Sequence, residues 1–398
     1  MKTFTYKYLI IGGGMTADAA IQGIREIDSE GTIGLISREE DPPYARPPLT
    51  KGLWTGEEEI EDIDLETSDK NVEMHLNQTV TKIDPAIKKV YDRNKNEYTY
   101  QKLLIASGGT PKKLPNIDEP GIIYYRTLID YKKLRDLVDK NNTFGVIGGG
   151  FIGSEIAAGI KMYNPDSKVS MIFPENGIGG LIFPKKLSEY LNAYYREKGV
   201  DVFSGELVAK ISKDKNEYLV ETKSGKIFKF DALIAGLGIN PTIEFLKETE
   251  IKVDDGIIVN EFLQTNIPDV YAAGDVARYH TTLLNRTLRV EHEDNALNMG
   301  EIVGQNMAGS EKKYEQLSYF YSDLFDVGYE AVGILNSKLE TVESWKEPYE
   351  EGIVYYLENE KVVGVLLWNV WEKVDDARQL ISERGTYPPE DLKSKIEF

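Results

Sequence analysis

Two glycine-rich turns of the same form constrain the fold of this chain more than any other feature. In the first, an apolar run from Tyr8 to Ile11 meets Gly12-Gly13-Gly14, and apolar residues then recur at helical spacing. This pattern predicts a strand, a tight turn and a helix, with the phosphates of a dinucleotide at the helix N-terminus. Because a glycine turn also occurs for packing reasons alone, one copy leaves both interpretations open.

The spacing of the small residues gives each of them a physical role. Gly12, Gly14 and Ala17 occupy the small-residue positions of the pattern G-x-G-x-x-G/A. Gly12 permits the turn, Gly14 lets the backbone approach a pyrophosphate closely, and Ala17 keeps the helix against the strand. The first copy therefore has every element that a dinucleotide-binding turn requires.

The same pattern occurs again in residues 143–158 (TFGVIGGGFIGSEIAA), and it changes the balance between the two interpretations. An enzyme that holds two dinucleotides needs two phosphate cradles. Each copy is followed by a polar meander of alternating strands and then by an apolar strand that runs into glycines. The second turn places Gly148, Gly150 and Gly153 in register with the first, the meanders are residues 80–100 and 208–230, and the apolar strands are residues 102–109 and 231–238. The chain therefore predicts an α/β fold with two Rossmann-like domains of one plan.

The composition limits the partners and the chemistry. The formal net charge is −19 over 398 residues, which argues against nucleic acid and anionic membranes because their phosphates would be repelled. No apolar run is long enough to span a bilayer and the N-terminus leads directly into a strand, so we expect a cytoplasmic protein. The chain has no cysteine, which excludes a redox-active dithiol, and its three histidines make a metal site unexpected. Chemistry in such a chain depends on cofactors.

Acidic residues follow the second strand of each glycine-turn unit, where an acid usually binds ribose. In the first unit we assign this contact to Glu39, although its neighbours Arg38 and Glu40 are also consistent with a solvated charge cluster. In the second unit Glu175 lies 22 residues after Gly153. A carboxylate there would bind both ribose hydroxyls of NAD and repel a 2′-phosphate, which favours NADH over NADPH.

Further polar residues lie at positions suited to a flavin. The proline-bound loop of residues 43–54 (PYARPPLTKGLW) carries Arg46 and Lys51, and it is a better candidate for holding a phosphate and a flavin ring than isolated surface cations are. Asp275 ends a short strand beside small residues, which suits a ribityl hydroxyl. Glu155, two residues past the second turn, is equally explained as a residue that favours a helix N-terminus.

The last part of the chain has a different pattern. From about residue 314 onward, residues 328–335, 352–357 and 362–368 predict antiparallel strands, and residues 374–381 predict a helix. This segment carries no phosphate-binding signature. It predicts a small α+β domain.

Several motifs together resemble a known family. The two glycine turns, with IASGG, IAGLGINP and VYAAGD, resemble the FAD-dependent pyridine nucleotide oxidoreductases. The loop PYARPPLTKGLW is similar to the corresponding loop in one branch of this family, the branch that contains ferredoxin reductases and apoptosis-inducing factor. The segments RVEHEDNA, YSDLFDVGYEAVGIL and VVGVLLWNV resemble the apoptosis-inducing factor family specifically. The resemblance covers nearly the whole chain, without that family's targeting segment, membrane anchor and long acidic insertion.

The resemblance implies two sets of cofactor-binding residues and a redox pair. It implies that FAD is held by Gly12, Gly13, Gly14, Arg46, Lys51, the backbone at Val80, Arg126, Asp275 and His292. It implies that NAD contacts Gly150, Ile152, Glu175, Gly238, Glu291 and Glu330. Lys51 and Glu155 would pair beside the flavin with Lys51 near its N5 edge, and Phe151 would cover the isoalloxazine until nicotinamide displaces it.

The chain departs from the family pattern at three positions. Tyr321 stands where a tryptophan usually lies against the flavin, which could alter stacking and access. Arg38 replaces an expected acid, and Gly180 stands where a lysine could help to hold NAD. The last departure bears on how tightly NAD binds.

These observations lead to one functional interpretation with an alternative. We expect an FAD-binding domain in residues 1–119 and 240–315, an NAD-binding domain in residues 120–239, and a C-terminal α+β domain in residues 316–398. The expected reaction is hydride transfer from NADH to FAD, with a charge-transfer complex and redox-dependent homodimerisation as in the apoptosis-inducing factor family. The alternative is a reductase that passes electrons to a ferredoxin, a rubredoxin or a quinone-like acceptor.

Overall fold

The computed structural model describes residues 1–215 and 217–398, which form two compact units. The first unit contains residues 1–46, 60–110 and 240–318. The second contains residues 47–59, 111–239 and 319–398, so the loop carrying Lys51 belongs with the second glycine turn. The expected α/β class is confirmed, whereas the expected three-domain boundaries stay predictions.

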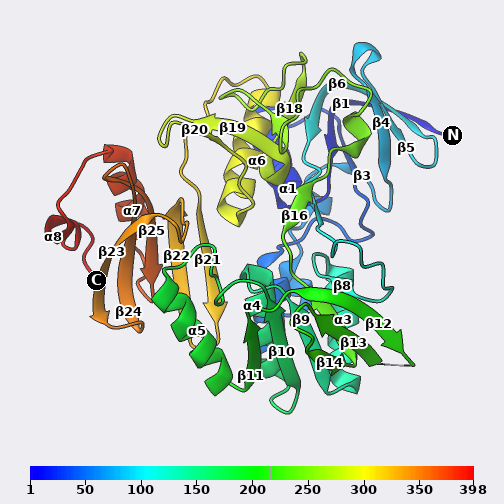
Figure 1. The fold of residues 1–398 in the computed structure, drawn as a ribbon. Helices are drawn as coiled ribbons and strands as arrows, with labels where there is room; N and C mark the ends of the chain where they lie inside the picture. Colours follow the sequence, from blue (N-terminus) through cyan, green and yellow to red (C-terminus); the bar gives the residue numbers. More distant parts are fainter. Residues whose placement is uncertain (216) are drawn as a thin grey trace. The chain divides into compact units, whose positions relative to one another are not determined.

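The first unit is built on a parallel sheet with an antiparallel extension (Figure 1). β1 (Thr3–Ile11) pairs in parallel with β2 (Ile33–Ile36) on one side and with β6 (Glu97–Ile105) on the other. The other strands of this sheet are β3 (Glu73–His75), β4 (Val80–Asp84), β5 (Lys89–Asp92) and β18 (Val270–Ala272). The meander expected from the alternating pattern forms where β5 pairs antiparallel with both β4 and β6.

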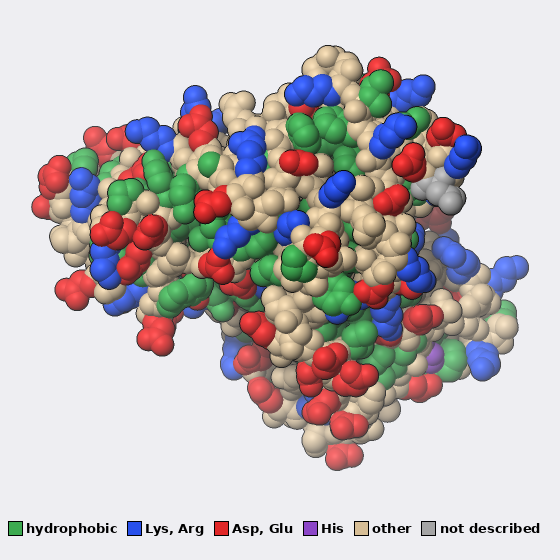
Figure 2. Space-filling view, turned by 90° about the horizontal axis from the view of Figure 1, so that it is seen from below, with side chains coloured by type: hydrophobic (Ala, Val, Ile, Leu, Met, Phe, Trp, Pro, Cys, Tyr) green, Lys and Arg blue, Asp and Glu red, His purple; other side chains and the backbone are tan. Residues whose placement is uncertain are grey.

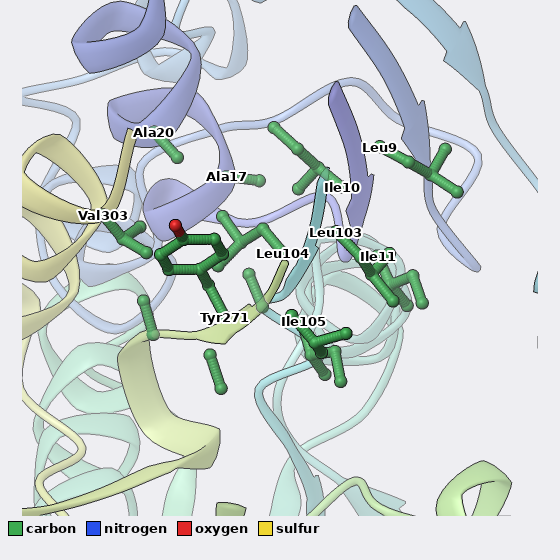
Figure 3. Packing of buried hydrophobic residues seen from close by; sticks show 14 of the residues in the cluster. Leu9, Ile10, Ile11, Ala17, Ala20, Leu103, Leu104, Ile105, Tyr271 and Val303 are labelled. Atoms are coloured by element: carbon green, nitrogen blue, oxygen red, sulfur yellow. The ribbon is translucent and has the colours of Figure 1, made fainter. Parts of the chain in front are cut away.

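Two helices of the first unit cross with their backbones in close contact. α1 (Met15–Ile27) packs against α6 (Glu293–Met307), and Gly23, Gly300 and Gly304 let the backbones meet. A Cβ on Gly304 would lie 2.1 Å from the carbonyl oxygen of Ala20, and one on Gly23 would lie 2.2 Å from that of Glu301. Figure 3 shows the core that these helices close, in which Tyr271 lies with Leu104 and Val303. The helices thereby hold the first glycine turn against the sheet.

The second unit contains a parallel sheet of the same plan and, in addition, a C-terminal antiparallel sheet with its own helix. β9 (Thr143–Ile147) pairs in parallel with β10 (Lys168–Phe173) and with β15 (Ala232–Ala235). α4 (Phe151–Tyr163) follows the second glycine turn and packs on this sheet. The other elements are β8 (Ile123–Tyr124), α3 (Leu128–Lys140), α5 (Lys185–Glu197), β11 (Val200–Ser204) and the antiparallel strands β12 (Val208–Asp214), β13 (Glu217–Thr222) and β14 (Ile227–Phe230).

The C-terminal part of the second unit is an antiparallel sheet, as the sequence pattern predicts. Its strands are β21 (Tyr319–Leu324), β22 (Val327–Gly333), β23 (Glu340–Glu347), β24 (Glu351–Glu358) and β25 (Lys361–Trp368). Their order in the sheet is β21-β22-β25-β24-β23, and α7 (Val374–Glu383) packs on β22 and β25. β24 and β25 are buried along nearly their whole length. A sheet with a helix packed on it is the usual arrangement of an α+β domain.

Shorter elements complete the fold. In the first unit they include β17 (Ile257–Ile258), β19 (Ala277–Thr281), β20 (Arg286–Leu288) and the 3-10 turns η2 (Ile60–Ile63), η3 (Thr67–Asp69), η4 (Pro85–Ile87), η5 (Glu244–Leu246) and η6 (Gly274–Val276). In the second unit they are η1 (Pro47–Thr50), α2 (Gly52–Thr55) and α8 (Pro389–Leu392). β7 (Gly109–Pro111) and β16 (Ile239–Pro241) lie where the chain passes between the units.

The surface carries both signs of charge. Figure 2 shows acidic and basic side chains interspersed over the face it draws, with acidic side chains gathered toward its lower edge. This agrees with an excess of acidic residues in the sequence. Among the described residues, the structure contains no helix that is both long enough and apolar enough to cross a membrane.

We predict that Gly304→Ala destabilises the first unit by about 1–3 kcal/mol, because the added methyl group would meet the Ala20 carbonyl and push the two helices apart. Urea unfolding measures the loss. The control is Leu297→Ala, which truncates an exposed side chain on the same helix and should change stability little. Equal stability of Gly304→Ala and the wild type would contradict the proposed close crossing.

Candidate functional site

The first glycine turn joins β1 to α1 and is too tight for a side chain at its first position. Gly12 has a φ of +124°, and a Cβ there would lie 2.0 Å from the carbonyl oxygen of Ala106. Gly14 is the N-cap of α1 and no side chain caps the helix. A Cβ on Gly14 would meet only the guanidinium of Arg46, at 3.9 Å. An uncapped helix N-terminus with open space and a cation beside it fits a pyrophosphate.

Glu39 and Arg46 form an ion pair next to this turn. Arg46 Nη2 donates to Glu39 Oε1 at 2.5 Å, and the hydroxyl of Tyr44 donates to Glu39 Oε2 at 2.6 Å. Burial by itself would raise the pKa of Glu39, but the Arg46 charge and the Tyr44 hydroxyl hold it below its usual value. Burial opposes the charge of Arg46 as well, yet Tyr44 and Glu39 keep its pKa raised. Glu39 is thus a paired carboxylate rather than part of a solvated cluster, and its contact with ribose stays a prediction.

Two further expected flavin residues of the first unit, Asp275 and His292, lie in η6 and at the start of α6, whereas Val80 begins β4. His292 is the N-cap of this helix, and burial lowers the pKa of its imidazole to about 4 although the Asp275 charge opposes the shift. Asp275 lies in η6, and its carbonyl oxygen accepts a hydrogen bond from Arg289 Nη1 at 3.0 Å. The same guanidinium nitrogen donates to Glu291 Oε1 at 2.6 Å. A neutral histidine beside an acid and a helix N-terminus can serve a polar ligand.

The second glycine turn has the same geometry as the first. Gly148 has a φ of +116°, and a Cβ there would lie 2.3 Å from the carbonyl oxygen of Gly236. A Cβ on Gly153 would lie 2.1 Å from the carbonyl oxygen of Gly148, which explains the third small residue of the pattern. Gly150 is the N-cap of α4 without a side-chain cap, and a Cβ there would meet nothing within 4 Å. The second turn therefore also fits a dinucleotide phosphate.

The expected NAD residues of the second unit are spread over several elements. Glu175 follows β10, and its carbonyl oxygen accepts from the backbone N–H of Gly205 at 2.8 Å. Gly238 has a φ of +80° and lies near Lys112 Nζ. Glu330 on β22 has a buried Oε2 without a hydrogen-bond partner among the described residues, and burial raises the pKa of this carboxyl. A buried carboxylate oxygen without a partner is compatible with a hydrogen bond from a ligand.

Lys51 and Glu155 form an ion pair within the second unit, as the resemblance implied. Lys51 Nζ donates to Glu155 Oε1, and the two side chains are 13% and 5% exposed. Glu155 lies in the first half of α4, so its carboxylate engages Lys51 rather than merely favouring the helix N-terminus. The Lys51 ammonium also lies 5.1 Å from the ring centroid of Tyr321. The placement of this pair beside a flavin stays a prediction.

Two hydroxyl groups that the sequence did not reveal complete this pair. Thr50 Oγ1 donates to Glu155 Oε2 at 2.5 Å, and Ser322 Oγ donates to Glu155 Oε1 at 2.6 Å. The Glu155 charge adds to burial in raising the pKa values of Tyr195 and Tyr329 well above the usual range. The only sequence signal was that Thr50 precedes Lys51, whereas Ser322 is distant in the chain.

Phe151 begins α4 and stands at the edge of this network. Its ring is 5.1 Å from that of Phe320, at an angle of 73° between the planes. Phe151 is 36% exposed, so its ring is accessible as a cover for a flat ligand. Its expected role over the isoalloxazine is a prediction.

The structure divides the expected site residues between the two units. The first unit holds Gly12, Gly13, Gly14, Ala17, Glu39, Arg46, Val80, Asp275, Glu291 and His292. The second holds Lys51, Arg126, Gly148, Gly150, Phe151, Ile152, Gly153, Glu155, Glu175, Gly238, Tyr321 and Glu330. Among the described residues, no cluster of histidines and acids has the form of a metal site.

We predict that Lys51→Ala and Glu155→Ala each destabilise the protein by about 3 kcal/mol, because each leaves a buried charge without its partner. Thr50 and Ser322 remain as donors after Lys51→Ala, which keeps the loss at the lower end of the usual range for buried pairs. Urea unfolding measures both losses and that of the double variant, which should lose less than the sum.

The matched control for this prediction is the exposed pair Lys185–Glu189 on α5. Its truncation should cost at most about 0.5 kcal/mol, as surface pairs one helical turn apart usually do. Additive losses at Lys51 and Glu155, or losses as small as those of the control, would show that the two residues do not depend on each other.

Comparisons with known proteins identify the family to which the chain is similar. The family model described as pyridine nucleotide-disulphide oxidoreductase matches residues 6–300. A second model, described as the C-terminal part of mitochondrion-associated apoptosis-inducing factor, matches residues 303–348 and 343–383. The two matches cover both glycine turns and the C-terminal sheet.

Individual relatives and solved structures extend over the same range. The chain is 37% identical over 423 residues to apoptosis-inducing factor 1, mitochondrial, of Dictyostelium discoideum, covering 96% of this chain and 79% of that protein. It is 31% identical over 398 residues to monodehydroascorbate reductase 3 of Arabidopsis thaliana, covering 91% and 89%. The crystal structure of putidaredoxin reductase in its covalent complex with putidaredoxin superimposes with a TM-score of 0.90 at 27% identity, covering 98% and 96%. The chain therefore belongs to the pyridine nucleotide-disulphide oxidoreductase family, within its apoptosis-inducing-factor-like members, and is an FAD-dependent oxidoreductase of nicotinamide dinucleotides.

Proposed function

We propose that this protein oxidises NADH in preference to NADPH and transfers the hydride to FAD. The observation that carries the proposal is the pair of uncapped helix N-termini at Gly14 and Gly150, each open to a phosphate. FAD, when bound, supplies the one-electron and two-electron chemistry that a chain without cysteine cannot supply itself. No dithiol takes part, so reduction should give reduced flavin without a thiolate-to-flavin charge-transfer band.

The chain's own residues bind and orient the cofactors in this proposal. Gly12–Gly14, Arg46 and His292 hold FAD, and the second glycine turn with Gly238 and Glu330 holds the nicotinamide dinucleotide. Lys51, oriented by Glu155, contributes positive charge near the flavin N5 edge. Such preorganised charge stabilises a reduced, electron-rich ring system. Hydride transfer between stacked rings depends on positioning rather than on a general base, which suits a chain with three histidines.

The preference for NADH rests on Glu175. Its backbone is fixed by the hydrogen bond from Gly205, and it follows a parallel strand at the position where an acid binds ribose. A carboxylate at this position accepts hydrogen bonds from the ribose hydroxyls and repels a 2′-phosphate. A Cβ on Gly180 would lie 3.2 Å from Glu175 Cβ, so the position without a lysine is a direct neighbour of this acid.

We predict that kcat/KM is higher for NADH than for NADPH, and that Glu175→Ala narrows this difference by about tenfold or more, the effect of one charge-assisted interaction. Steady-state kinetics with both cofactors checks the expectation. Glu189→Ala, an exposed acid on α5, is the control and should keep the wild-type ratio. Equal or better use of NADPH by the wild type would contradict the assignment.

The reduced flavin can pass its electrons on in two ways, and each corresponds to a different role of the protein. We propose the role of an apoptosis-inducing-factor-like protein, in which reduced flavin and NAD form a long-lived charge-transfer complex that favours a homodimer through residues 316–398. The match of the C-terminal model to residues 303–383 supports it. The alternative is a reductase for a small iron–sulfur protein, which the likeness to putidaredoxin reductase supports. We propose a cytoplasmic location for either role.

An anaerobic NADH titration followed by absorbance and light scattering tests the first role. We expect FAD rather than FMN as the released flavin, a persistent long-wavelength band and an increase in molar mass on reduction. Steady-state assays with a ferredoxin, a rubredoxin, a quinone and monodehydroascorbate should then show slow turnover. Fast reduction of an iron–sulfur protein without a change in mass would favour the alternative, and the absence of bound FAD would contradict both roles.

A further inference from the structure

The carboxylate of Glu155 is held by side chains from two distant segments. Thr50 and Lys51 come from the short segment that contains η1 and α2, and they bind Oε2 and Oε1 respectively. Ser322 comes from β21 of the C-terminal sheet, 167 residues away in the chain, and donates to Oε1 at 2.6 Å. Lys51 and Ser322 thus share one carboxylate oxygen.

Ser322 occupies a position where the strand pattern favours an apolar residue. Alternate residues of a strand point to the same face, so Ser322 lies between Phe320 and Leu324 on one face of β21. Its side chain is fully buried, and an unpaired hydroxyl there would cost free energy. The hydrogen bond to Glu155 accounts for this polar residue in a buried position.

β21 contacts the ion pair through a second residue as well. The ring of Tyr321 lies 5.1 Å from Lys51 Nζ, in the range of a cation–π interaction. Two consecutive residues of β21 therefore contact the ion pair. Tyr321 contacts the Lys51 ammonium, and Ser322 contacts the Glu155 carboxylate. The position of the ammonium depends on this strand as well as on the segment that carries Lys51.

We propose that Ser322 is a positioning residue for Lys51. By fixing Glu155 Oε1, the Ser322 hydroxyl sets where the ammonium lies, and the C-terminal sheet in this way tunes the redox properties of the flavin. The inference rests on the proposed function in one respect, namely that Lys51 acts on the flavin. The link from Ser322 to Lys51 through Glu155 can be tested separately.

The experiment compares Ser322→Ala with Ser322→Thr, which keeps the hydroxyl, and with Ser382→Ala. Ser382 is an exposed serine of α7 that donates to the Arg378 carbonyl oxygen, and its loss is the matched control. Lys51→Met provides the reference, because it removes the charge directly. For each flavin-loaded protein, the midpoint potential and the rate of flavin reduction by NADH are measured, and Ser322→Ala is repeated in a Glu155→Gln background.

We expect Ser322→Ala to shift the midpoint potential in the same direction as Lys51→Met, by a smaller amount, and to slow flavin reduction by about tenfold, the scale of one hydrogen bond to a charged group. Ser322→Thr should restore both values, and Ser382→Ala should leave them unchanged. In the Glu155→Gln background, Ser322→Ala should add no further shift. A shift of the potential by Lys51→Met but not by Ser322→Ala would overturn the inference.

A stability cycle decides the matter without reference to the flavin potential. The losses in free energy of unfolding, measured with urea for Ser322→Ala, Lys51→Met and the double variant, should be non-additive. The double variant should lose less than the sum, because both residues act on one oxygen. If Lys51→Met leaves the midpoint potential of the flavin unchanged, the proposed role of Lys51 at the flavin fails. Additive losses in unfolding free energy would then also overturn the positioning role of Ser322, whereas non-additive losses would support it.

Discussion

The close approach of a carbonyl oxygen to a glycine is the constraint on which both units of the molecule depend. At Gly12 and Gly148 a Cβ would lie 2.0 and 2.3 Å from the carbonyl oxygens of Ala106 and Gly236. Each of these oxygens belongs to the residue just past the strand that pairs in parallel with the turn's own strand. Because the chain turns within this narrow space, each helix begins at once and without a side-chain cap. The N–H groups of its first turn are left for an anion.

Burial requires the carboxylates of Glu39 and Glu155 to be paired with hydrogen-bond donors. Glu39 is paired with Arg46 and Tyr44, and Glu155 with Lys51, Thr50 and Ser322. A buried carboxylate is tolerated only when donors satisfy both oxygens, which is the case for each of these two residues. The same requirement explains why a serine occupies a core-facing position of β21.

Much of the fold was predictable because it follows from local patterns. The two turns, the parallel strands β1 and β10, the meander around β5 and the C-terminal strands β22, β24 and β25 were all expected from apolar periodicity and glycine spacing. The division of the chain into units was harder to predict from the sequence. Residues 47–59 belong to the second unit, although the segments before and after them in the sequence belong to the first. No local pattern encodes which body a short loop packs against, because long-range contacts decide it.

The sequence by itself determined the duplicated plan, the two glycine turns and the absence of thiol chemistry, because glycine spacing, strand periodicity and cysteine content are local or compositional properties. The tertiary structure decided how the individual side chains are paired. The Glu155 carboxylate forms an ion pair with Lys51 and does not merely favour the N-terminus of α4. The Glu39 carboxylate forms an ion pair with Arg46 and is not part of a solvated charge cluster. The tertiary structure also brought Ser322 to a carboxylate 167 residues away in the chain, a contact that only the folded arrangement of β21 and α4 creates.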